Sequence, residues 1–371
     1  MCISLERWGI VKILLLNNNF YGSYVSNQYF YSELVDACQE LGVACTFVSC
    51  LEDAIAAIER QDISFSLCLG VFPYRLQGTP LYDLYNLPHY QWLSDNPLKF
   101  HLDHHSVNIT YIFIDKQFPD IAGTLQQNPL ILPLGYSKKK RQTFSDKKTN
   151  AILFPGQIRN LQSIRQQIKR SVYSKEIVEF LETYNYDTSY IQKLQTFTQG
   201  FSADKKIEIF RLTNSYLRTN KRIQAINSIH TLPVYIAGEN YENPEIPENK
   251  NIRFIGKYDY FEIEKQMNRY RYVLNIDPNY HATIHERISR GINAGSISIS
   301  NWNDVVNPDG GFSMAFRFDG TIPIDELIER ATSDLSELHR QQSGFIRELS
   351  WKDRLERILY DFTQNKRGRL D

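Results

Sequence analysis

The sequence has few cysteines, no long apolar run and no excess of charge of either sign. Its five cysteines lie between Cys2 and Cys68, and none of them forms a CxxC pair. An odd number without that spacing argues against a disulfide framework and against a structural zinc site. The pattern favours free thiols in a reducing compartment.

Apolar runs are short throughout the chain. The run nearest the start, Val11–Leu16, is too short for the core of a signal peptide. No stretch approaches the roughly 20 residues of a membrane span. We therefore predict a cytoplasmic protein without a transmembrane segment.

Positive and negative side chains balance, with 42 of each and a formal net charge of zero. Nucleic-acid-binding domains are usually basic, so we predict no nucleic-acid partner. Short basic runs occur at Lys138–Arg141 and Lys366–Arg369. We interpret them as a solvated linker and tail; weak peripheral contact with an anionic membrane, or with nucleic acid, is the alternative.

The residues that are present alternate between strand-like and helix-like patterns. In the first third, apolar runs such as Ala44–Val48 and His89–Leu93 separate segments with helical spacing such as Ser26–Leu41. Strands alternating with helices predict an α/β fold with parallel sheets. The polar stretch Ser137–Asn150 reads as a linker, after which new strands begin near residues 151, 234, 252, 272 and 297.

We predict three segments from this organisation. Residues 1–145 form an N-terminal Rossmann-like domain, residues 146–345 a second one, and residues 346–371 a C-terminal helix that packs back toward the first domain. Long helical stretches are predicted at Leu161–Lys193 and Leu338–Thr363. A ligand site is expected in a cleft between the two domains, where small-molecule sites concentrate.

The segment Tyr272–Asn301 is the most informative in the chain. It reads as a buried strand, a polar loop, a helix at about Ile284–Asn293, a stop at Gly295 and a second buried strand. Open α/β sheets bind ligands at the carboxyl ends of their strands, and helix N-termini favour anions. The pattern predicts a phosphate site here.

Several short motifs, in a fixed order between about residues 90 and 360, resemble those of GT-B glycosyltransferases of the spore-maturation-protein-like group, with a "glycosyl transferases group 1" C-terminal domain. The resemblance rests on Trp92–Pro97, Phe154–Arg159, Leu232–Gly238, Phe254–Lys257, Val273–Ile276, His285–Arg287 with Ala294-Gly295, and Trp351 with Arg354. It implies two Rossmann-like domains facing a cleft and closed by a C-terminal helix.

The resemblance also implies an activity: transfer of a sugar from a UDP-, GDP- or dTDP-sugar to a hydroxyl or side-chain acceptor, on a glycan, a lipid-linked molecule or a protein. No other cofactor is required. The residues expected to bind the donor are Arg159, Gly238, Lys257, Asn275, His285, Glu286, Arg287 and Gly295.

Each charged candidate also has a plainer interpretation. Arg287 is expected to offset the charge of the leaving diphosphate, and Arg159 and Lys257 to reach the diphosphate or nucleotide. All three also fit surface positions. His285 is expected either to bind a phosphate or to cap the helix, and with no third ligand type beside it and His281 we predict no metal site.

Two positions depart from related enzymes. Arg290 stands where a ribose-binding glutamate is usual, and Ala282 where the retaining clan has its first glutamate. We therefore expect an inverting, metal-independent enzyme whose general base comes from the N-terminal domain. The candidates are Asp95 and His105; His101, Asp103 and His104 are neighbours of the second, and the loop Asn17–Ser23 is expected to face the same cleft.

Arg290 also favours a second reading, in which the chain is a catalytically inactive GT-B-like protein that binds a nucleotide or a partner. A sugar-nucleotide epimerase or a phosphorylase is a third.

Overall fold

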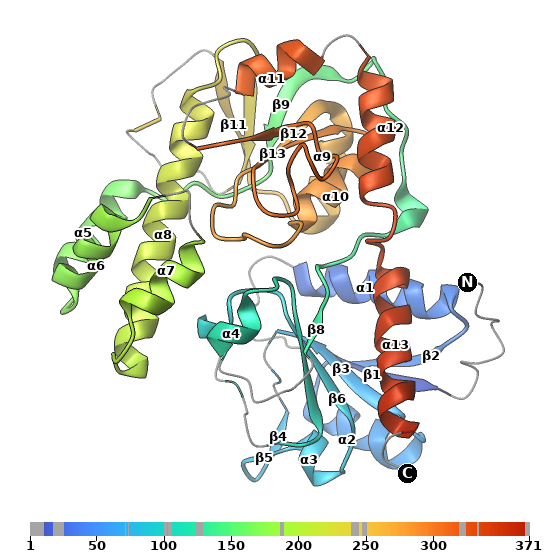
Figure 1. Cartoon of the computed structure of the whole chain (residues 1–371). Helices are drawn as coiled ribbons and strands as arrows, with labels where there is room; N and C mark the ends of the chain where they lie inside the picture. The colour runs from blue at the N-terminus through green and yellow to red at the C-terminus, as the bar shows by residue number, and fades with distance from the viewer. Residues whose placement is uncertain are drawn as a thin grey trace. The chain divides into compact units, whose positions relative to one another are not determined.

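The structure, a computed structural model, describes residues 11–17, 26–70, 72, 74–99, 102, 106–122, 129–185, 189–238, 245–246, 251–318, 324–331 and 334–367. The chain divides into two compact units (Figure 1). Unit 1 comprises residues 1–139 and 348–371, and unit 2 comprises residues 140–347.

Unit 1 is built on a six-stranded sheet in the order β2-β1-β3-β6-β7-β8, in which every pairing is parallel. Its strands are β1 (Lys12–Leu16), β2 (Ala44–Val48), β3 (Phe65–Leu69), β6 (His89–Leu93), β7 (Ile109–Phe113) and β8 (Leu130–Ile131). Its helices are α1 (Ser26–Glu40), α2 (Leu51–Arg60), α3 (Leu81–Leu84), α4 (Phe118–Ala122) and α13 (Trp351–Arg367), and β4 (Arg75–Leu76) pairs with β5 (Thr79–Pro80).

The helix α13 completes the core of unit 1. The ring of Trp351 packs against Phe30 of α1 and Trp92 of β6, at centroid distances of 5.8 and 5.3 Å. Further along the helix, Phe362 packs against Phe65 of β3 at 4.9 Å. The last segment of the chain therefore packs with its first elements.

Unit 2 contains a second parallel sheet, in the order β11-β10-β9-β12-β13-β14. The strands are β9 (Thr149–Phe154), β10 (Val234–Ala237), β11 (Ile252–Gly256), β12 (Tyr270–Asn275), β13 (Ile297–Asn301) and β14 (Ala315–Phe316). In chain order this is 3-2-1-4-5-6, the order of a Rossmann fold. The prediction of an α/β protein with two Rossmann-like parallel sheets is confirmed.

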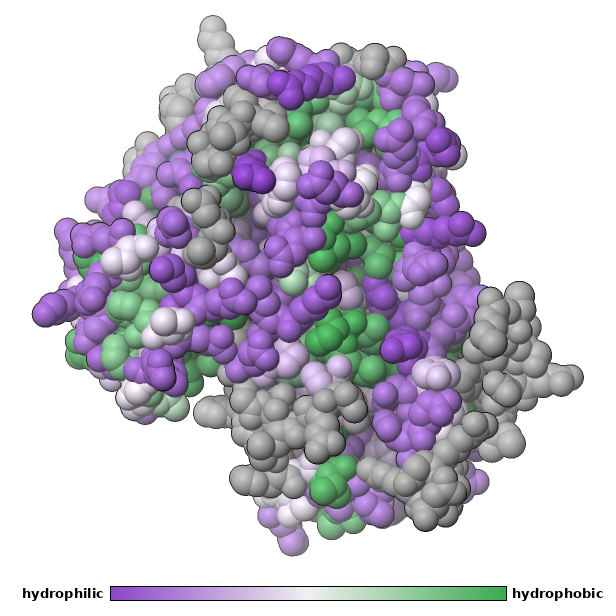
Figure 2. Space-filling view, viewed as in Figure 1, coloured by the Kyte–Doolittle hydropathy of each residue, from purple (hydrophilic) through white to green (hydrophobic). Residues whose placement is uncertain are grey.

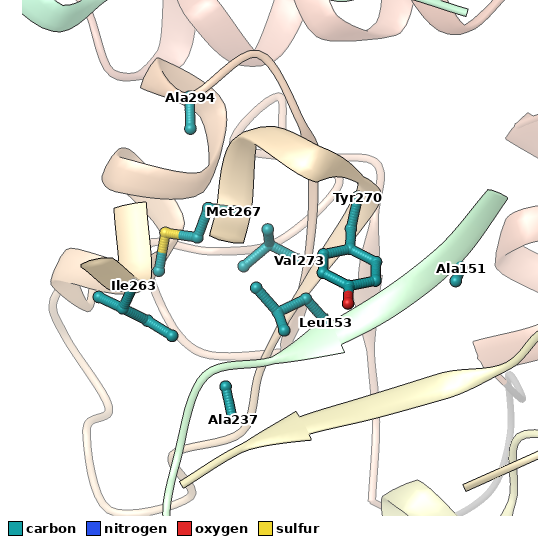
Figure 3. Close-up of a cluster of buried hydrophobic side chains, with 8 residues drawn as sticks. All are labelled: Ala151, Leu153, Ala237, Ile263, Met267, Tyr270, Val273 and Ala294. Atoms are coloured by element: carbon teal, nitrogen blue, oxygen red, sulfur yellow. The ribbon is translucent and has the colours of Figure 1, made fainter. Parts of the chain in front are cut away.

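A group of buried side chains joins the sheet of unit 2 to α9 (Tyr260–Arg269) and to the end of α10 (Glu286–Asn293). Figure 3 shows the residues on β9, β10 and β12 pointing toward those of the helices. The members are Ala151, Leu153, Ala237, Ile263, Met267, Tyr270, Val273 and Ala294. Because this core fixes α10 against β12, it fixes the loop between them.

The prediction of one long helical stretch at Leu161–Lys193 is wrong, because the stretch is interrupted. It consists of α5 (Leu161–Arg170), α6 (Ser174–Thr183) and α7 (Tyr190–Phe197), and the long helix α8 (Ala203–Asn227) follows. Local caps separate the helices: Asn160, Ser189 and Ser202 accept backbone N–H bonds at the starts of α5, α7 and α8.

The predicted helix Leu338–Thr363 is likewise two helices. The first, α12 (Leu335–Phe345), belongs to unit 2 and the second, α13, to unit 1. At the break, the backbone N–H and hydroxyl of Ser350 donate to the carboxylate of Asp353 at 2.9 and 2.5 Å. The chain thus passes between units at a capped turn. Helix α11 (Ile324–Ala331) precedes α12.

Hydrophilic side chains cover much of the face drawn in Figure 2, with hydrophobic ones in small groups between them. The most exposed large apolar residues are Val172 at 86% and Val107 at 81%. Within the described ranges, no helix has both the length and the apolar character needed to cross a membrane.

Candidate anion-binding site

The strand order of unit 2 reverses between β9 and β12, and the carboxyl ends of these two strands meet there. Parallel sheets bind ligands at such a switch point. The chain leaves β9 as Pro155–Arg159 and leaves β12 as Ile276–His285, which leads into α10.

Arg222 of α8 bonds to both strand ends. Its Nη1 donates to the carbonyl of Gln157 at 2.8 Å and its Nε to the carbonyl of Ile276 at 3.1 Å. The guanidinium also lies 5.5 Å from the centre of the Phe154 ring. These contacts hold a positive charge at the bottom of the crevice.

Asp277 lies beside this guanidinium, with a side chain only 2% exposed. One carboxylate oxygen is 3.1 Å from Arg218 Nη2, 3.7 Å from Arg222 Nη2 and 3.4 Å from His285 Nε2. Burial raises the pKa of Asp277, but the charges of Arg218, His285 and Arg222 outweigh it and hold the pKa well below its usual range. The carboxyl group is therefore ionised.

His285 joins two carboxylates at the start of α10. Its Nδ1 is 2.7 Å from Glu286, while its Nε2 faces Asp277. Nδ1 also accepts the backbone N–H of Arg287 at 3.3 Å, so the side chain of His285 caps the start of α10. Burial raises the pKa of Glu286, but His285 and Arg287 outweigh this effect and hold the pKa well below its usual range. The hydroxyl of Tyr260 also donates to Glu286, at 3.0 Å, so the carboxylate of Glu286 already accepts a hydrogen bond within unit 2.

Arg287 and Arg159 complete the arrangement. Nη1 of Arg287 is 3.4 Å from Asn275 Oδ1, and the Asn275 amide donates to Ser300 at 3.0 Å. Arg159 is exposed, and its Nη1 is 3.3 Å from the hydroxyl of Ser215 on α8.

Four arginines share this location: Arg159, Arg218, Arg222 and Arg287, here called the arginine cluster. Burial lowers the pKa of Arg222, and the charges of Arg218, Arg287 and Arg159 lower it further, so the guanidinium groups interact electrostatically. The carboxylate of Asp277 pairs with Arg218 and Arg222, and those of Asp277 and Glu286 lie beside His285. Clustered guanidinium groups are typical of sites that bind phosphates.

The structure brings five of the expected donor-binding residues together: Arg159, Asn275, His285, Glu286 and Arg287. Gly238 lies beside them, because a Cβ there would be 2.5 Å from the carbonyl oxygen of Gly156, in the loop after β9. Lys257 is exposed and follows the edge strand β11.

Gly295 lies at the other end of α10, next to the start of β13. The N–H groups of Gly295 and Ser296 donate to Ile292 and Gly291, as in a Schellman motif. Gly295 has a φ of +79°, and a Cβ would be 2.5 Å from the Thr143 carbonyl oxygen. The glycine is thus explained by the helix end, away from the arginine cluster.

The residues predicted as general base lie in unit 1. Asp95 follows β6, and its Oδ1 accepts the backbone N–H of Asn96 at 2.8 Å. His105 lies outside the described residues, together with His101, Asp103, His104 and residues 18–23.

The switch point of unit 1, between β1 and β3, is filled differently. The hydroxyl of Tyr31 donates to the carbonyl of Leu16, the last residue of β1, and accepts the N–H of Leu69, the last of β3, at 2.8 Å. Burial raises the pKa of Tyr31, so the group is a neutral phenol. In the described part of the chain, a neutral phenol bonds to both strand ends at this switch point, whereas guanidinium groups lie at that of unit 2.

Arg290, the departure noted in the sequence, has its own carboxylate partner on a neighbouring helix. It is buried and donates to Glu264 of α9 at 2.5 Å. Its charge therefore connects α10 to α9.

Arg218, Arg222 and Asp277 were not among the site residues predicted from the sequence. The available signal was the spacing of the two arginines, four residues apart in a predicted helical region, which places them on one face. Asp277 follows directly after a buried strand, and a charged residue at that position indicates a ligand site at the edge of the sheet.

No protein-family model and no curated protein sequence matches the chain. Solved structures are similar in fold. AviGT4, a glycosyltransferase involved in avilamycin A biosynthesis, has a TM-score of 0.58 at 12% identity and covers 95% of this chain and 97% of its own. The T4 phage BGT, in complex with UDP and Mn²⁺, has a TM-score of 0.52 at 13% identity, with 94% and 99% covered.

An α-glucosyltransferase in complex with UDP and a 13-mer DNA has a TM-score of 0.53 at 12% identity, with 95% and 99% covered. At these identities the likeness establishes the fold, which is GT-B.

Proposed function

We propose that the protein is a glycosyltransferase of the spore-maturation-protein-like type that uses a nucleotide sugar and binds the donor diphosphate at the arginine cluster of unit 2. The observation that carries the proposal is this cluster at the β9/β12 switch point. The contrast with the neutral Tyr31 in unit 1 supports assigning the donor to unit 2.

Charge supports a diphosphate in particular. Four guanidinium groups lie at the switch point, and guanidinium groups bind phosphate oxygens through charge-assisted hydrogen bonds. The bridging diphosphate of a nucleotide sugar carries two negative charges. Preorganised cations of this kind stabilise the charge that develops on the leaving group when the sugar is transferred.

The proposed roles follow from exposure and contacts. Arg159, Arg218 and Arg287 reach the phosphates, while Arg222, held by two carbonyls, supplies charge from below. Asn275 orients Arg287. Gly238 and Lys257 lie on the nucleotide side.

Transfer is proposed to need no divalent metal, because the arginines supply the positive charge. Mn²⁺ is present in the T4 phage BGT structure. Here, the buried carboxylate Asp277 already faces Arg218, Arg222 and His285, and a divalent cation at Asp277 would be repelled by the two guanidinium groups. The donor set does not suit a metal.

We propose inversion, with Asp95 or His105 removing the proton of an acceptor hydroxyl on a glycan, a lipid-linked molecule or a protein. The α-glucosyltransferase complex contains DNA, so an acceptor panel should include an oligonucleotide, with no transfer to it expected. The anomeric configuration of the product, read by NMR, decides the stereochemistry.

The central test compares arginines on the same helix. Arg218→Gln should weaken binding of UDP, GDP or dTDP in calorimetry by about tenfold or more, since one charge-assisted contact is lost. Arg211→Gln is the matched control, because Arg211 is on α8 but pairs with Glu208 at the surface. Equal affinities of the two variants would refute the donor site. Tight binding with no transfer would support the inactive nucleotide-binding alternative.

A further inference from the structure

The two α8 arginines that face Asp277 are held differently. Arg222 has a side chain 6% exposed and bonds to two backbone carbonyls. Arg218 is 28% exposed and lies closer to Asp277, at 3.1 Å. Arg222 is fixed by the backbone, while Arg218 reaches the surface of the crevice.

Asp277 is an unusual buried carboxylate. Arg218, Arg222 and His285 all face one of its oxygens, at 3.1 to 3.7 Å, while the other oxygen has no hydrogen-bond partner within the described part of the chain. Buried polar groups normally have hydrogen-bond partners. Asp277 is thus held from one side, by the three side chains that face this oxygen.

We propose that Asp277 is an internal counter-ion that Arg218 exchanges for the donor diphosphate. The inference rests on the proposed function, since it concerns the same site. Without a ligand, guanidinium groups this close together repel one another, and the Asp277 carboxylate offsets that repulsion. When a diphosphate arrives, Arg218 turns to it, and Arg222 and His285 remain to balance Asp277.

This exchange has an energetic consequence. Part of the attraction between Arg218 and the diphosphate is used to break the pair with Asp277, and the Asp277 charge itself repels the ligand. Asp277 therefore weakens binding of any diphosphate, including the nucleoside diphosphate product, while it stabilises the ligand-free fold. A residue that only positioned the arginines would strengthen binding.

The experiment is a double-mutant cycle on the whole chain, with Asp277→Asn, Arg218→Gln and the double variant. Calorimetry with UDP and with pyrophosphate should show several-fold tighter binding to Asp277→Asn than to the wild type. The gain should vanish when Arg218 is also replaced. In urea, Asp277→Asn should be less stable than the wild type, and the double variant should recover part of the loss.

A structure of the wild-type protein with UDP tests the exchange without any substitution. Arg218 should bind a phosphate oxygen and lie more than 4 Å from Asp277, the limit of an ion pair. Arg218 still paired with Asp277 in that complex would overturn the inference, as would weaker UDP binding by Asp277→Asn.

The outcomes separate the two proposals. Wild-type binding of pyrophosphate but of no nucleotide, with the cycle as expected, would leave the exchange standing and reject the proposed function. Wild-type binding of UDP with a reversed cycle would reject the exchange alone. Binding of neither ligand would reject both.

Discussion

Nε1 of Trp351 donates a hydrogen bond of 2.7 Å to the buried carboxylate of Glu33, joining residues 318 positions apart in the sequence. The contact links α13 to α1 within unit 1. A Cβ on Gly135 would be 2.6 Å from the Trp351 backbone nitrogen, so the chain segment before the linker also packs closely here.

Trp351→Phe should destabilise the protein, because it removes a donor from a buried carboxylate. We expect a loss of about 1–3 kcal/mol in the free energy of unfolding, measured in urea. Glu33→Gln keeps an acceptor for the indole and should cost less. An unchanged unfolding free energy for Trp351→Phe would show that this bond does not stabilise unit 1.

The stability of the protein should fall below about pH 6.5 because of His89. This residue is buried, with Nδ1 2.8 Å from the Ser66 hydroxyl, and burial lowers its pKa to about 3 from 6.5. The unfolded chain therefore binds a proton that the folded chain does not, so the contribution is complete above the unfolded pKa and is lost progressively as pH falls toward the folded one.

The measurement is the unfolding free energy between pH 7 and 5. His89 should contribute a slope of about 1.4 kcal/mol per pH unit in the lower part of this range. His89→Gln should remove that slope, while the buried His339 keeps its own share. An unaltered slope in His89→Gln would contradict the assignment.

Two glycines with similar backbone conformations should respond differently to alanine. Gly200 has φ +81° with no atom within 4 Å of an added Cβ, and Gly295 has φ +79° with the Thr143 oxygen at 2.5 Å. Gly200→Ala should cost about 1 kcal/mol, the cost of the left-handed conformation alone. Gly295→Ala should cost clearly more, since backbone must move, and equal losses of stability would contradict this account.

Sugar transfer should persist when divalent metals are removed. In the proposed function, the arginine cluster supplies the positive charge that offsets the leaving diphosphate. Once a donor and acceptor are identified, initial rates with EDTA should equal those with added Mn²⁺. Activity lost in EDTA and restored by Mn²⁺ would refute metal independence.

Much of the fold could be predicted from the sequence, because a buried parallel strand appears as a short run of apolar or β-branched residues. His89–Leu93 and Ala44–Val48 are apolar or β-rich runs, and both are strands with the predicted bounds. The end of α10 could also be predicted, because Gly295 adopts a left-handed conformation that few other residues tolerate.

The breaks inside the predicted helical stretches could not be predicted from the sequence. Ser171–Tyr173 and Ile346–Ser350 carry no proline, and both fall within stretches that also suit a helix. At these breaks the Ser171 hydroxyl accepts the N–H of Tyr173 and the Ser350 hydroxyl donates to Asp353. Such local bonds depend on side-chain rotamers, which a periodic pattern does not specify.

The sequence by itself determined two α/β sheets and a polar strand–helix junction that includes Arg287 and His285. Only the tertiary structure decided that Arg218 and Arg222 of α8 face that junction, and that Asp277 lies between them. The physical reason is that the sequence pattern of an amphipathic helix does not specify whether an arginine side chain extends into solvent or toward a buried polar site. Its direction is set by the packing of α8 against elements distant in sequence, which bring the ends of β9 and β12 within reach of its guanidinium.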